Sequence, residues 1–354
     1  MSRFLDERLS SLVAYVPGEQ PKPGEFIKLN TNEFPYPPAV GVEAAASDAV
    51  MNMNLYSDLN CKALTESFYN VFGYGKNNVV FTNGSDEALY LSFLAFCGKE
   101  CGVAFADITY GFYSVYADLC GIESTVIPLD NELSINPNDY FNLNKTIVIA
   151  NPNAPTGKML TVEQIETIIK QNPNNIIVID EAYADFSEQT CVKLTEKYNN
   201  LVVIGTFSKS RGMAGARLGY LIACEELIND IQRVKFSINP YNVNSLTQAV
   251  GKAVLDNNDY YAERVKEICE TRDSFSEGIK LLGFDVIPSK TNFVFAKHNT
   301  VKGKYIADKL REKGILIRRF DKERICEYLR ISIGTPEQMK VVYTALSEII
   351  GGNL

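Results

Sequence analysis

The sequence has 354 residues, of which 46% are hydrophobic and 22% charged, as in globular proteins large enough for two domains. Its formal net charge of −8 argues against a nucleic-acid partner, since binding to phosphate backbones requires basic surface. The single histidine, His298, has no plausible partner nearby in sequence, which disfavours histidine catalysis and histidine metal sites. We therefore expect no metal, and expect Lys, Tyr, Asp or a cofactor to carry any chemistry.

The first residues, MSRFLDERLSSLVAYV, carry charges where a signal peptide needs an apolar core. No apolar run approaches the roughly 20 residues of a membrane-spanning helix. The eight cysteines form no CxxC pair, which is typical of free thiols in a reducing compartment. The sequence thus predicts a cytoplasmic protein without a membrane partner.

Residues 16–38, VPGEQPKPGEFIKLNTNEFPYPP, contain six prolines and are predicted to lack regular secondary structure. Their apolar and aromatic residues favour a segment that packs against something. We expect residues 1–40 to form a docked arm, and the family resemblance given below implies that it packs on the active site and on a smaller domain.

Short runs rich in Val and Ile follow, without strict alternation, as in strands buried on both faces of a sheet. Helical patterns, for example at residues 86–96 and 162–170, lie between several of them. Alternating strands and helices indicate a mostly parallel seven-stranded sheet sandwiched by helices, and we assign this large domain to residues 41–245. The predicted strands are residues 78–82, 102–107, 124–128, 146–150, 176–180, 201–206 and 218–223.

After about Pro240 the pattern changes to longer helices. Thr335, Pro336 and Gln338 predict a capped final helix, because they supply an N-cap, a first-turn proline and a capping box. This mixture of longer helices and a few strands indicates a smaller α+β domain over residues 246–354. Its predicted elements are helices at 243–255 and 260–282, a hairpin within 284–297, a helix at 303–313 and strands at 315–318 and 328–333.

Ligands of parallel α/β sheets bind at the carboxyl ends of the strands, so the residues that follow each strand carry the functional signal. The first strand leads into NGSDEAL, a helix start suited to an anion, and the second into DITYGFY, with Tyr110. The fourth ends in the stiff loop NPNAPTG. The fifth ends in VIDEAYADF, with Asp180 and Tyr183, and the sixth ends in TFSKSRGMAGARLGY, with Lys209 and Arg217.

Together these residues meet the requirements of pyridoxal phosphate. A helix N-terminus, a serine and an arginine can bind its phosphate, and a buried Asp can keep its ring nitrogen protonated. A lysine can form a Schiff base, and an aromatic side chain can stack on the ring. A nucleotide-binding protein is the alternative of another class, but neither GxGxxG nor GxxxxGK[ST] occurs in the sequence.

The four segments NGSDEAL, NPNAPTG, VIDEAYADF and TFSKSRGMAGARLGY resemble the signature segments of fold-type-I pyridoxal phosphate-dependent aminotransferases. Within that group the chain resembles the histidinol-phosphate aminotransferases, through LNTNEFPYPP, LYSD, PYNVNSLTQ and YLRISIGTPEQ. The resemblance spans essentially the whole chain. It implies the α/β fold of the fold-type-I transferases, with a smaller α+β domain, and a homodimer with shared active sites.

The resemblance also implies roles for the residues of the cofactor site. Lys209 would bond to the cofactor and move protons, Asp180 would pair with the ring nitrogen, and Tyr183 would hydrogen-bond the phenolic oxygen O3′. Tyr110 would stack on the ring, and Tyr56 would reach the phosphate bound by the neighbouring subunit. The phosphate would otherwise be held by Ser85, Asp86, Thr206, Ser208 and Arg217.

For the substrate, the resemblance implies that Arg330 clamps the α-carboxylate and that Arg318 helps to hold a substrate phosphate. Arg319 would point the other way along the strand. Tyr15 and Asn32 match arm residues that line the substrate pocket.

Two positions depart from the family pattern. Ala154 stands where the family usually has an Asn that binds O3′, so either Tyr183 alone holds O3′ or Asn153 reaches in. The arm reads NEFP where the family often has NENP, which affects the substrate contacts near Phe34.

The implied reaction is ping-pong transamination between a small-molecule amino donor and a keto acceptor. It would convert histidinol phosphate and 2-oxoglutarate to imidazole-acetol phosphate and glutamate, a reaction of histidine biosynthesis. An L-threonine-O-3-phosphate decarboxylase and an aromatic amino acid aminotransferase on the same fold are the alternatives. A non-enzymatic regulator fits least, because the chain keeps Lys209 and has no length to spare for a DNA-binding domain.

Overall fold

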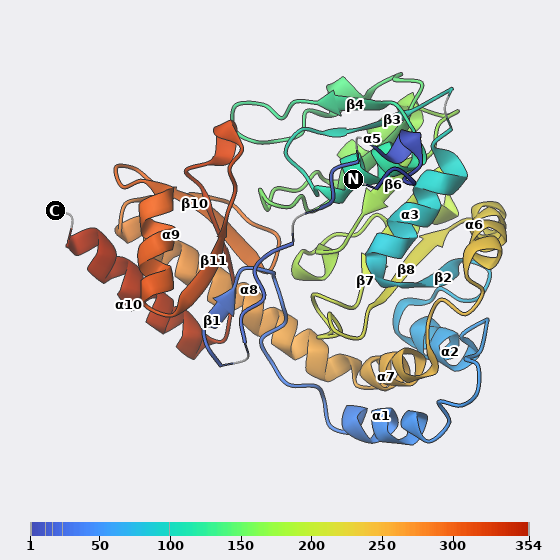
Figure 1. Ribbon diagram of the computed structural model, residues 1–354, viewed down its shortest axis with the longest axis horizontal. Coiled ribbons are helices and arrows are strands. Elements are labelled where there is room, and N and C mark those ends of the chain that lie inside the picture. The colour runs from blue at the N-terminus through green and yellow to red at the C-terminus, as the bar shows by residue number, and fades with distance from the viewer. Residues whose placement is uncertain (1, 11, 16, 23, 99, 353–354) are drawn as a thin grey trace.

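A computed structural model describes residues 2–10, 12–15, 17–22, 24–98 and 100–352. It shows a large α/β domain and a smaller α+β domain, and the long helix α8 (Asn258–Leu281) runs from one to the other (Figure 1). No helix in the described ranges is long and apolar enough to cross a membrane.

All seven predicted strands of the large domain lie in one sheet, with the order β2-β8-β7-β6-β5-β3-β4. Only β8 runs antiparallel to its neighbours, β2 and β7, while the other pairs are parallel. The predicted mostly parallel seven-stranded sheet is thus confirmed. The strands are β2 (Val79–Asn83), β3 (Val103–Ala106), β4 (Ser124–Ile127), β5 (Thr146–Ala150), β6 (Ile177–Asp180), β7 (Leu201–Thr206) and β8 (Leu218–Ala223).

Helices cover both faces of this sheet, which explains the uninterrupted apolar runs of its strands. Successive residues of β5 alternate between the two faces. Val148 packs in the cluster under α3, α4 and α6, whereas Ile147 and Ile149 pack in the cluster under α5. These helices span α3 (Gly84–Phe96), α4 (Phe112–Cys120), α5 (Val162–Gln171) and α6 (Glu225–Ile238).

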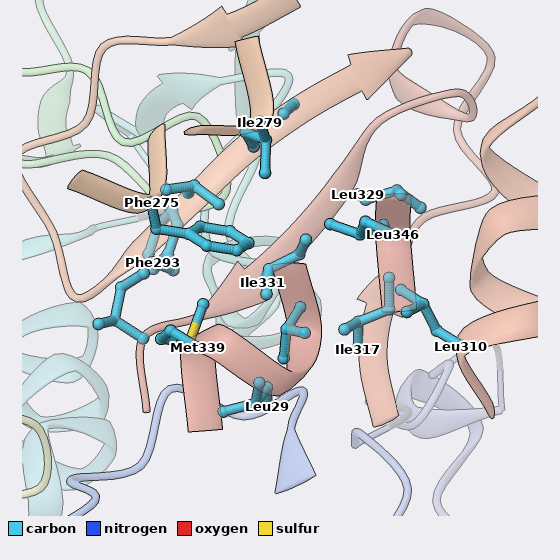
Figure 2. Packing of buried hydrophobic residues seen from close by; sticks show 14 of the residues in the cluster. Leu29, Phe275, Ile279, Phe293, Leu310, Ile317, Leu329, Ile331, Met339 and Leu346 are labelled. Carbon is cyan, nitrogen blue, oxygen red and sulfur yellow. The ribbon is translucent and has the colours of Figure 1, made fainter. Parts of the chain in front are cut away.

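The small domain holds a five-stranded sheet with the order β1-β11-β12-β10-β9. The predicted hairpin is the antiparallel pair of β9 and β10, and the predicted capping box of the last helix is present at Thr335 and Gln338. Figure 2 shows the core between this sheet and its helices. The elements are β9 (Phe284–Ile287), β10 (Phe293–His298), β11 (Ile315–Arg319), β12 (Leu329–Ser332), α9 (Gly303–Glu312) and α10 (Pro336–Gly351).

The proline-rich arm contains a strand, so the expectation that it lacks regular secondary structure is wrong. β1 (Ile27–Leu29) pairs in parallel with β11 and extends the small-domain sheet, as Figure 1 shows in blue beside orange. The strand occupies the longest stretch of the segment without proline, Gly24–Phe34, where backbone N–H groups are free to pair. The arm is therefore docked through its backbone.

Helix α7 (Ser245–Asp256) begins where we expected the small domain to start, but it packs against α1 (Val42–Val50) and α2 (Lys62–Phe72) of the large domain. We therefore propose that the domain boundary lies within α8. The short 3-10 turns are Glu7–Leu9, Pro137–Tyr140, Ala184–Phe186, Val192–Glu196 and Glu323–Ile325.

Replacing Ile331 by Ala should destabilise the small domain by about 2–5 kcal/mol, because Ile331 is fully buried on β12 and its truncation leaves a cavity. Urea unfolding measures the loss. Val341→Ala on the exposed face of α10 is the matched control and should change stability by no more than about 0.5 kcal/mol. Equal effects of the two variants would contradict the packing in Figure 2.

Candidate active site

Two adjoining cavities open at the carboxyl ends of the large-domain strands. The inner chamber, of about 130 Å³, is lined by the predicted cofactor residues Ser85, Asp86, Tyr110, Asp180, Tyr183, Thr206, Ser208, Lys209 and Arg217. The outer chamber, of about 290 Å³, is lined by the predicted substrate residues Tyr15, Asn32, Arg318 and Arg330. Four residues line both chambers, namely Tyr110, Ala154, Tyr183 and Lys209. The amine of Lys209 is therefore accessible from either chamber.

Lys209 lies on the turn that follows β7. Its amine donates a hydrogen bond of 3.1 Å to the backbone oxygen of Thr31 in the arm and lies 5.9 Å from the centre of the Tyr183 ring. In the described part of the chain no carboxylate forms an ion pair with it. A neutral backbone oxygen therefore holds the amine between the two chambers without neutralising it.

The floor of the inner chamber is an anion cradle. Helix α3 starts there without a side-chain cap, so the N–H groups of its first turn point toward the chamber. The start of α3 lies so close to β8 that a Cβ on Gly219 would come within 2.4 Å of the backbone of Gly84 and Ser85. Ser208 contributes a hydroxyl that lies 3.0 Å from that of Thr206.

Arg217 lies over this cradle in a left-handed backbone conformation, with φ of 56°, which is strained for a residue with a side chain. Its guanidinium forms a 2.8 Å ion pair with Asp86, whose other oxygen accepts a 2.7 Å hydrogen bond from Tyr110. The carboxylate of Asp86 thus orients Arg217 and Tyr110. We propose that any contact of Asp86 with a phosphate comes from its backbone N–H at the start of α3.

Asp180 ends β6, lines the inner chamber and is only 5% exposed. Its oxygens accept hydrogen bonds from the Tyr113 hydroxyl at 2.8 Å and from the backbone N–H of Ala182 at 3.1 Å. Burial raises the pKa of this carboxyl group to about 6, and no cationic side chain among the described residues forms an ion pair with it. A cationic ligand atom would supply the missing partner.

Tyr183 stands between the chambers and is held by the arm. Its hydroxyl accepts a 2.8 Å hydrogen bond from the Asn32 amide, which leaves the hydroxyl proton free to be donated to a ligand. Asn32 is itself fixed, since its Oδ1 accepts a 2.8 Å hydrogen bond from Ser332 and its backbone oxygen accepts one of 3.0 Å from Asn292. The arm and the small domain together set the position of Tyr183.

Asn153 lines neither chamber, and its amide group is bonded to other residues. Its amide nitrogen donates to the Ile108 backbone oxygen at 2.9 Å and to the Thr156 hydroxyl at 3.0 Å, and its oxygen accepts from Thr109 at 2.8 Å. It lines a separate cavity, whereas the methyl group of Ala154 faces both chambers. We therefore propose that Asn153 does not contact the cofactor and that Tyr183 alone is the partner of O3′.

The outer chamber gathers positive charge. Arg318 on β11 and Arg330 on β12 lie directly opposite each other in the antiparallel register. Arg330 donates to the Asn30 backbone oxygen at 2.9 Å, its Nε has no partner among the described residues, and burial lowers its pKa. Like charges placed opposite each other are unfavourable, so the pair is typical of an anion site.

Arg319 points away from the outer chamber, as the alternation of a strand predicted. Its guanidinium donates to the Cys326 backbone oxygen at 3.0 Å and pairs with Asp321. Phe34, where the arm departs from the family pattern, packs against Tyr36 and Tyr261 and does not line either chamber.

Tyr56 lies outside both chambers of its own chain, is 83% exposed, and stacks on Tyr241 with ring centres 4.4 Å apart. The sequence analysis missed Tyr113, whose only signal is its place three residues after Tyr110, and the arm carbonyls of Asn30 and Thr31. Backbone oxygens leave no signal in a sequence.

The inner chamber fits pyridoxal phosphate. The uncapped helix and Arg217 suit its phosphate, the unpaired buried carboxylate of Asp180 suits a protonated ring nitrogen, and the Lys209 amine suits its aldehyde. No group of three or more His, Cys, Asp and Glu side chains in the described ranges is placed to hold a metal ion.

Comparison with known proteins agrees with this chemistry. The family model for class I and II aminotransferases matches residues 24–346. The chain is 42% identical to a histidinol-phosphate aminotransferase of Brachyspira hyodysenteriae, with 99% of each chain covered, and 41% identical to one of Clostridium beijerinckii, with 100% and 99% covered. It shares its fold with the histidinol-phosphate aminotransferase of Sinorhizobium meliloti, solved in complex with pyridoxal 5′-phosphate, at a TM-score of 0.82, 22% identity and 92% and 91% coverage.

The raised pKa of Asp180 predicts that the free energy of unfolding of the ligand-free protein depends on pH. A carboxyl group whose pKa rises from 3.8 to about 6 on folding costs up to about 3 kcal/mol once it is charged. This cost grows as the pH rises from about 4 to about 6 and is complete above that range. Asp180→Asn, which keeps both hydrogen-bond partners, should therefore stabilise the ligand-free protein at pH 8 and have less effect at pH 5.

Urea unfolding at the two pH values measures this difference, and the exposed variant Asp118→Asn on α4 is the control. A stability difference between Asp180→Asn and the wild type that is the same at both pH values would contradict the effect of burial.

Proposed function

The chain belongs to the class I and II aminotransferases, which depend on pyridoxal phosphate, and within this family we propose that it acts on histidinol phosphate. The reaction would be histidinol phosphate and 2-oxoglutarate to imidazole-acetol phosphate and glutamate, in histidine biosynthesis. The observation that carries a phosphorylated amine as the substrate is the pair of opposed arginines, Arg318 and Arg330, in a chamber that also borders Lys209. The histidinol-phosphate aminotransferases at 42% and 41% identity support histidinol phosphate as that amine.

The opposed positions of Arg318 and Arg330 support a binding site for the anionic group of the substrate in the small domain. Histidinol phosphate carries a phosphate beside its amine-bearing carbon, whereas glutamate carries a carboxylate there. Arg330 is placed for the shared anionic position, and Arg318 adds the second positive charge that a phosphate dianion requires. Both substrates would therefore present their amine toward Lys209.

Bound pyridoxal phosphate supplies an aldehyde that takes up the amino group and a ring that accepts electrons from the substrate carbon. The Lys209 amine, at the border of the chambers, is placed to take a proton from that carbon and to return it. Asp180 would hold the ring nitrogen in its protonated state. Tyr183, whose hydroxyl accepts from Asn32, would donate its proton to O3′, and Arg217 would hold the phosphate.

The site also supports a homodimer with shared active sites. Tyr56 is held by Tyr241 at the surface, outside the chambers of its own chain, as expected of a residue that serves a neighbouring subunit. All eight cysteines are free, in line with the proposal of a cytoplasmic enzyme.

A substrate panel tests the proposed function. We expect the enzyme to convert histidinol phosphate with 2-oxoglutarate to glutamate, and to use L-threonine phosphate and phenylalanine at least about tenfold less efficiently in kcat/KM. Glutamate formation and CO₂ release are the readouts. Release of CO₂ from threonine phosphate would instead support the decarboxylase, and a preference for phenylalanine would support the aromatic aminotransferase.

Removing the amine of Lys209 should abolish turnover. We expect Lys209→Ala to lose at least about a thousandfold in kcat, since both proton transfers depend on this amine, while the circular dichroism spectrum stays unchanged. Lys340→Met, on the exposed surface of α10, is the control. Normal transamination by Lys209→Ala would refute the assigned role.

Subunit complementation tests the shared site. A hybrid of one Lys209→Ala subunit and one Tyr56→Phe subunit would contain one intact site, because Lys209 and the Tyr56 that serves it would come from different chains. At limiting cofactor we expect the hybrid to regain about half of the wild-type activity, as one of two sites is restored. A hybrid no more active than the average of its parents would show that Tyr56 does not act across the interface.

A further inference from the structure

One cation of the outer chamber has no part in the site as described so far. Lys322 lines this chamber with Lys209, Arg318 and Arg330, and none of the residues that line it is acidic. It belongs to the segment between β11 and the 3-10 turn Glu323–Ile325, and it is exposed at the mouth of the chamber.

Two carboxylates close to Lys322, those of Asp107 and Asp321, form ion pairs with other residues. Its ammonium donates a 3.0 Å hydrogen bond to the backbone oxygen of Asp107, but the side chain of Asp107 forms a 2.8 Å ion pair with Arg324. The adjacent Asp321 pairs with Arg319. Within the described residues Lys322 forms no ion pair, so its charge is available to a ligand.

The proposed function requires a further cation in the outer chamber. The same chamber must accept two substrates in turn, and they share an amine and an anion on adjacent carbons. They differ in the remaining arm, which is an imidazole in histidinol phosphate and a carboxylate in glutamate and 2-oxoglutarate. Arg330 and Arg318 lie opposite each other and serve the shared anion, so the second carboxylate needs another cation.

We propose that Lys322 binds the distal carboxylate of the dicarboxylate substrate, and this inference rests on the proposed function. The side chain has a long, flexible stem, and its alternative partner is a neutral backbone oxygen. When an imidazole occupies the chamber the ammonium can remain on Asp107, and when a carboxylate occupies it the ammonium can turn inward. Aromatic side chains of Tyr15, Tyr110 and Phe320 line the same chamber and offer flat surfaces to an imidazole.

Inert ligands test this assignment on the holoenzyme without turnover. Glutarate has both carboxylates of 2-oxoglutarate and no reactive carbonyl, and pentanoate has the same chain length with one carboxylate. We expect Lys322→Met to weaken glutarate binding roughly tenfold and to remove most of the preference for glutarate over pentanoate, as measured by calorimetry. Lys322→Arg should keep the preference, and Lys340→Met is the surface-charge control.

Kinetics of the separate half-reactions give a second readout. In Lys322→Met, the loss of kcat/KM for glutamate should exceed that for histidinol phosphate roughly tenfold, and glutamine, a neutral analogue of glutamate, should be affected little. Equal losses for glutamate and histidinol phosphate, or an unchanged preference for glutarate, would overturn the inference.

The two proposals fail in different ways. If histidinol phosphate is not a substrate of the wild type, the proposed function is wrong, yet the comparison of glutarate with pentanoate still decides the role of Lys322. If histidinol phosphate is a substrate but Lys322→Met binds glutarate like the wild type, only the inference about Lys322 is wrong.

Discussion

The site depends on charges that are buried or half-buried and are not neutralised by one another. The carboxylate of Asp180 on β6 and the cations of Lys209 and Arg330 each have neutral partners, namely the Tyr113 hydroxyl and the backbone oxygens of Thr31 and Asn30. Neutral partners fix the position of a charge but do not neutralise it. The free energy lost by removing the charge from water therefore lowers the stability of the folded protein. A ligand with a cationic ring nitrogen and anionic groups at both ends relieves this cost, so the stability of the bound state and the chemistry of the site have one physical origin.

The arm connects these charges. Three consecutive arm residues contact three different functional groups: Asn30 accepts from Arg330, Thr31 accepts from Lys209, and Asn32 donates to Tyr183. The left-handed backbone of Asn32, with φ of 58°, is held by Ser332 and Asn292 of the small domain. Because β1 anchors the arm to β11, a displacement of the small domain would move contacts of the inner chamber as well as those of the outer one.

The seven strands of the large sheet could be predicted because each is a compact apolar run followed by a helix, a pattern that depends on local sequence. β1 could not, since three residues become a strand only through β11, which lies almost 290 residues later in the chain. Most of the candidate cofactor residues follow strand ends, and we predicted them for that reason. The orientation of Asn153 depends on contacts with Ile108, Thr109 and Thr156, which no spacing in the sequence reveals. Lys322 could not be predicted either, because its segment matches no motif and reaches the outer chamber only in the folded chain.

Different residues of the outer chamber would recognise the charge and the shape of a substrate. Arg318 and Arg330 repel each other across their strands, and a phosphate dianion relieves that repulsion more fully than a single carboxylate does. These arginines would therefore favour any phosphorylated amine and cannot by themselves distinguish histidinol phosphate from threonine phosphate. The uncharged side chains that line the chamber, such as Tyr15, Tyr110 and Ile325, must make that distinction. The imidazole of histidinol phosphate can contact them, whereas the methyl group of threonine phosphate is too small to do so. A flexible cation at the mouth, rather than a fixed one in the wall, allows those surfaces to serve an imidazole in one half-reaction and a carboxylate in the other.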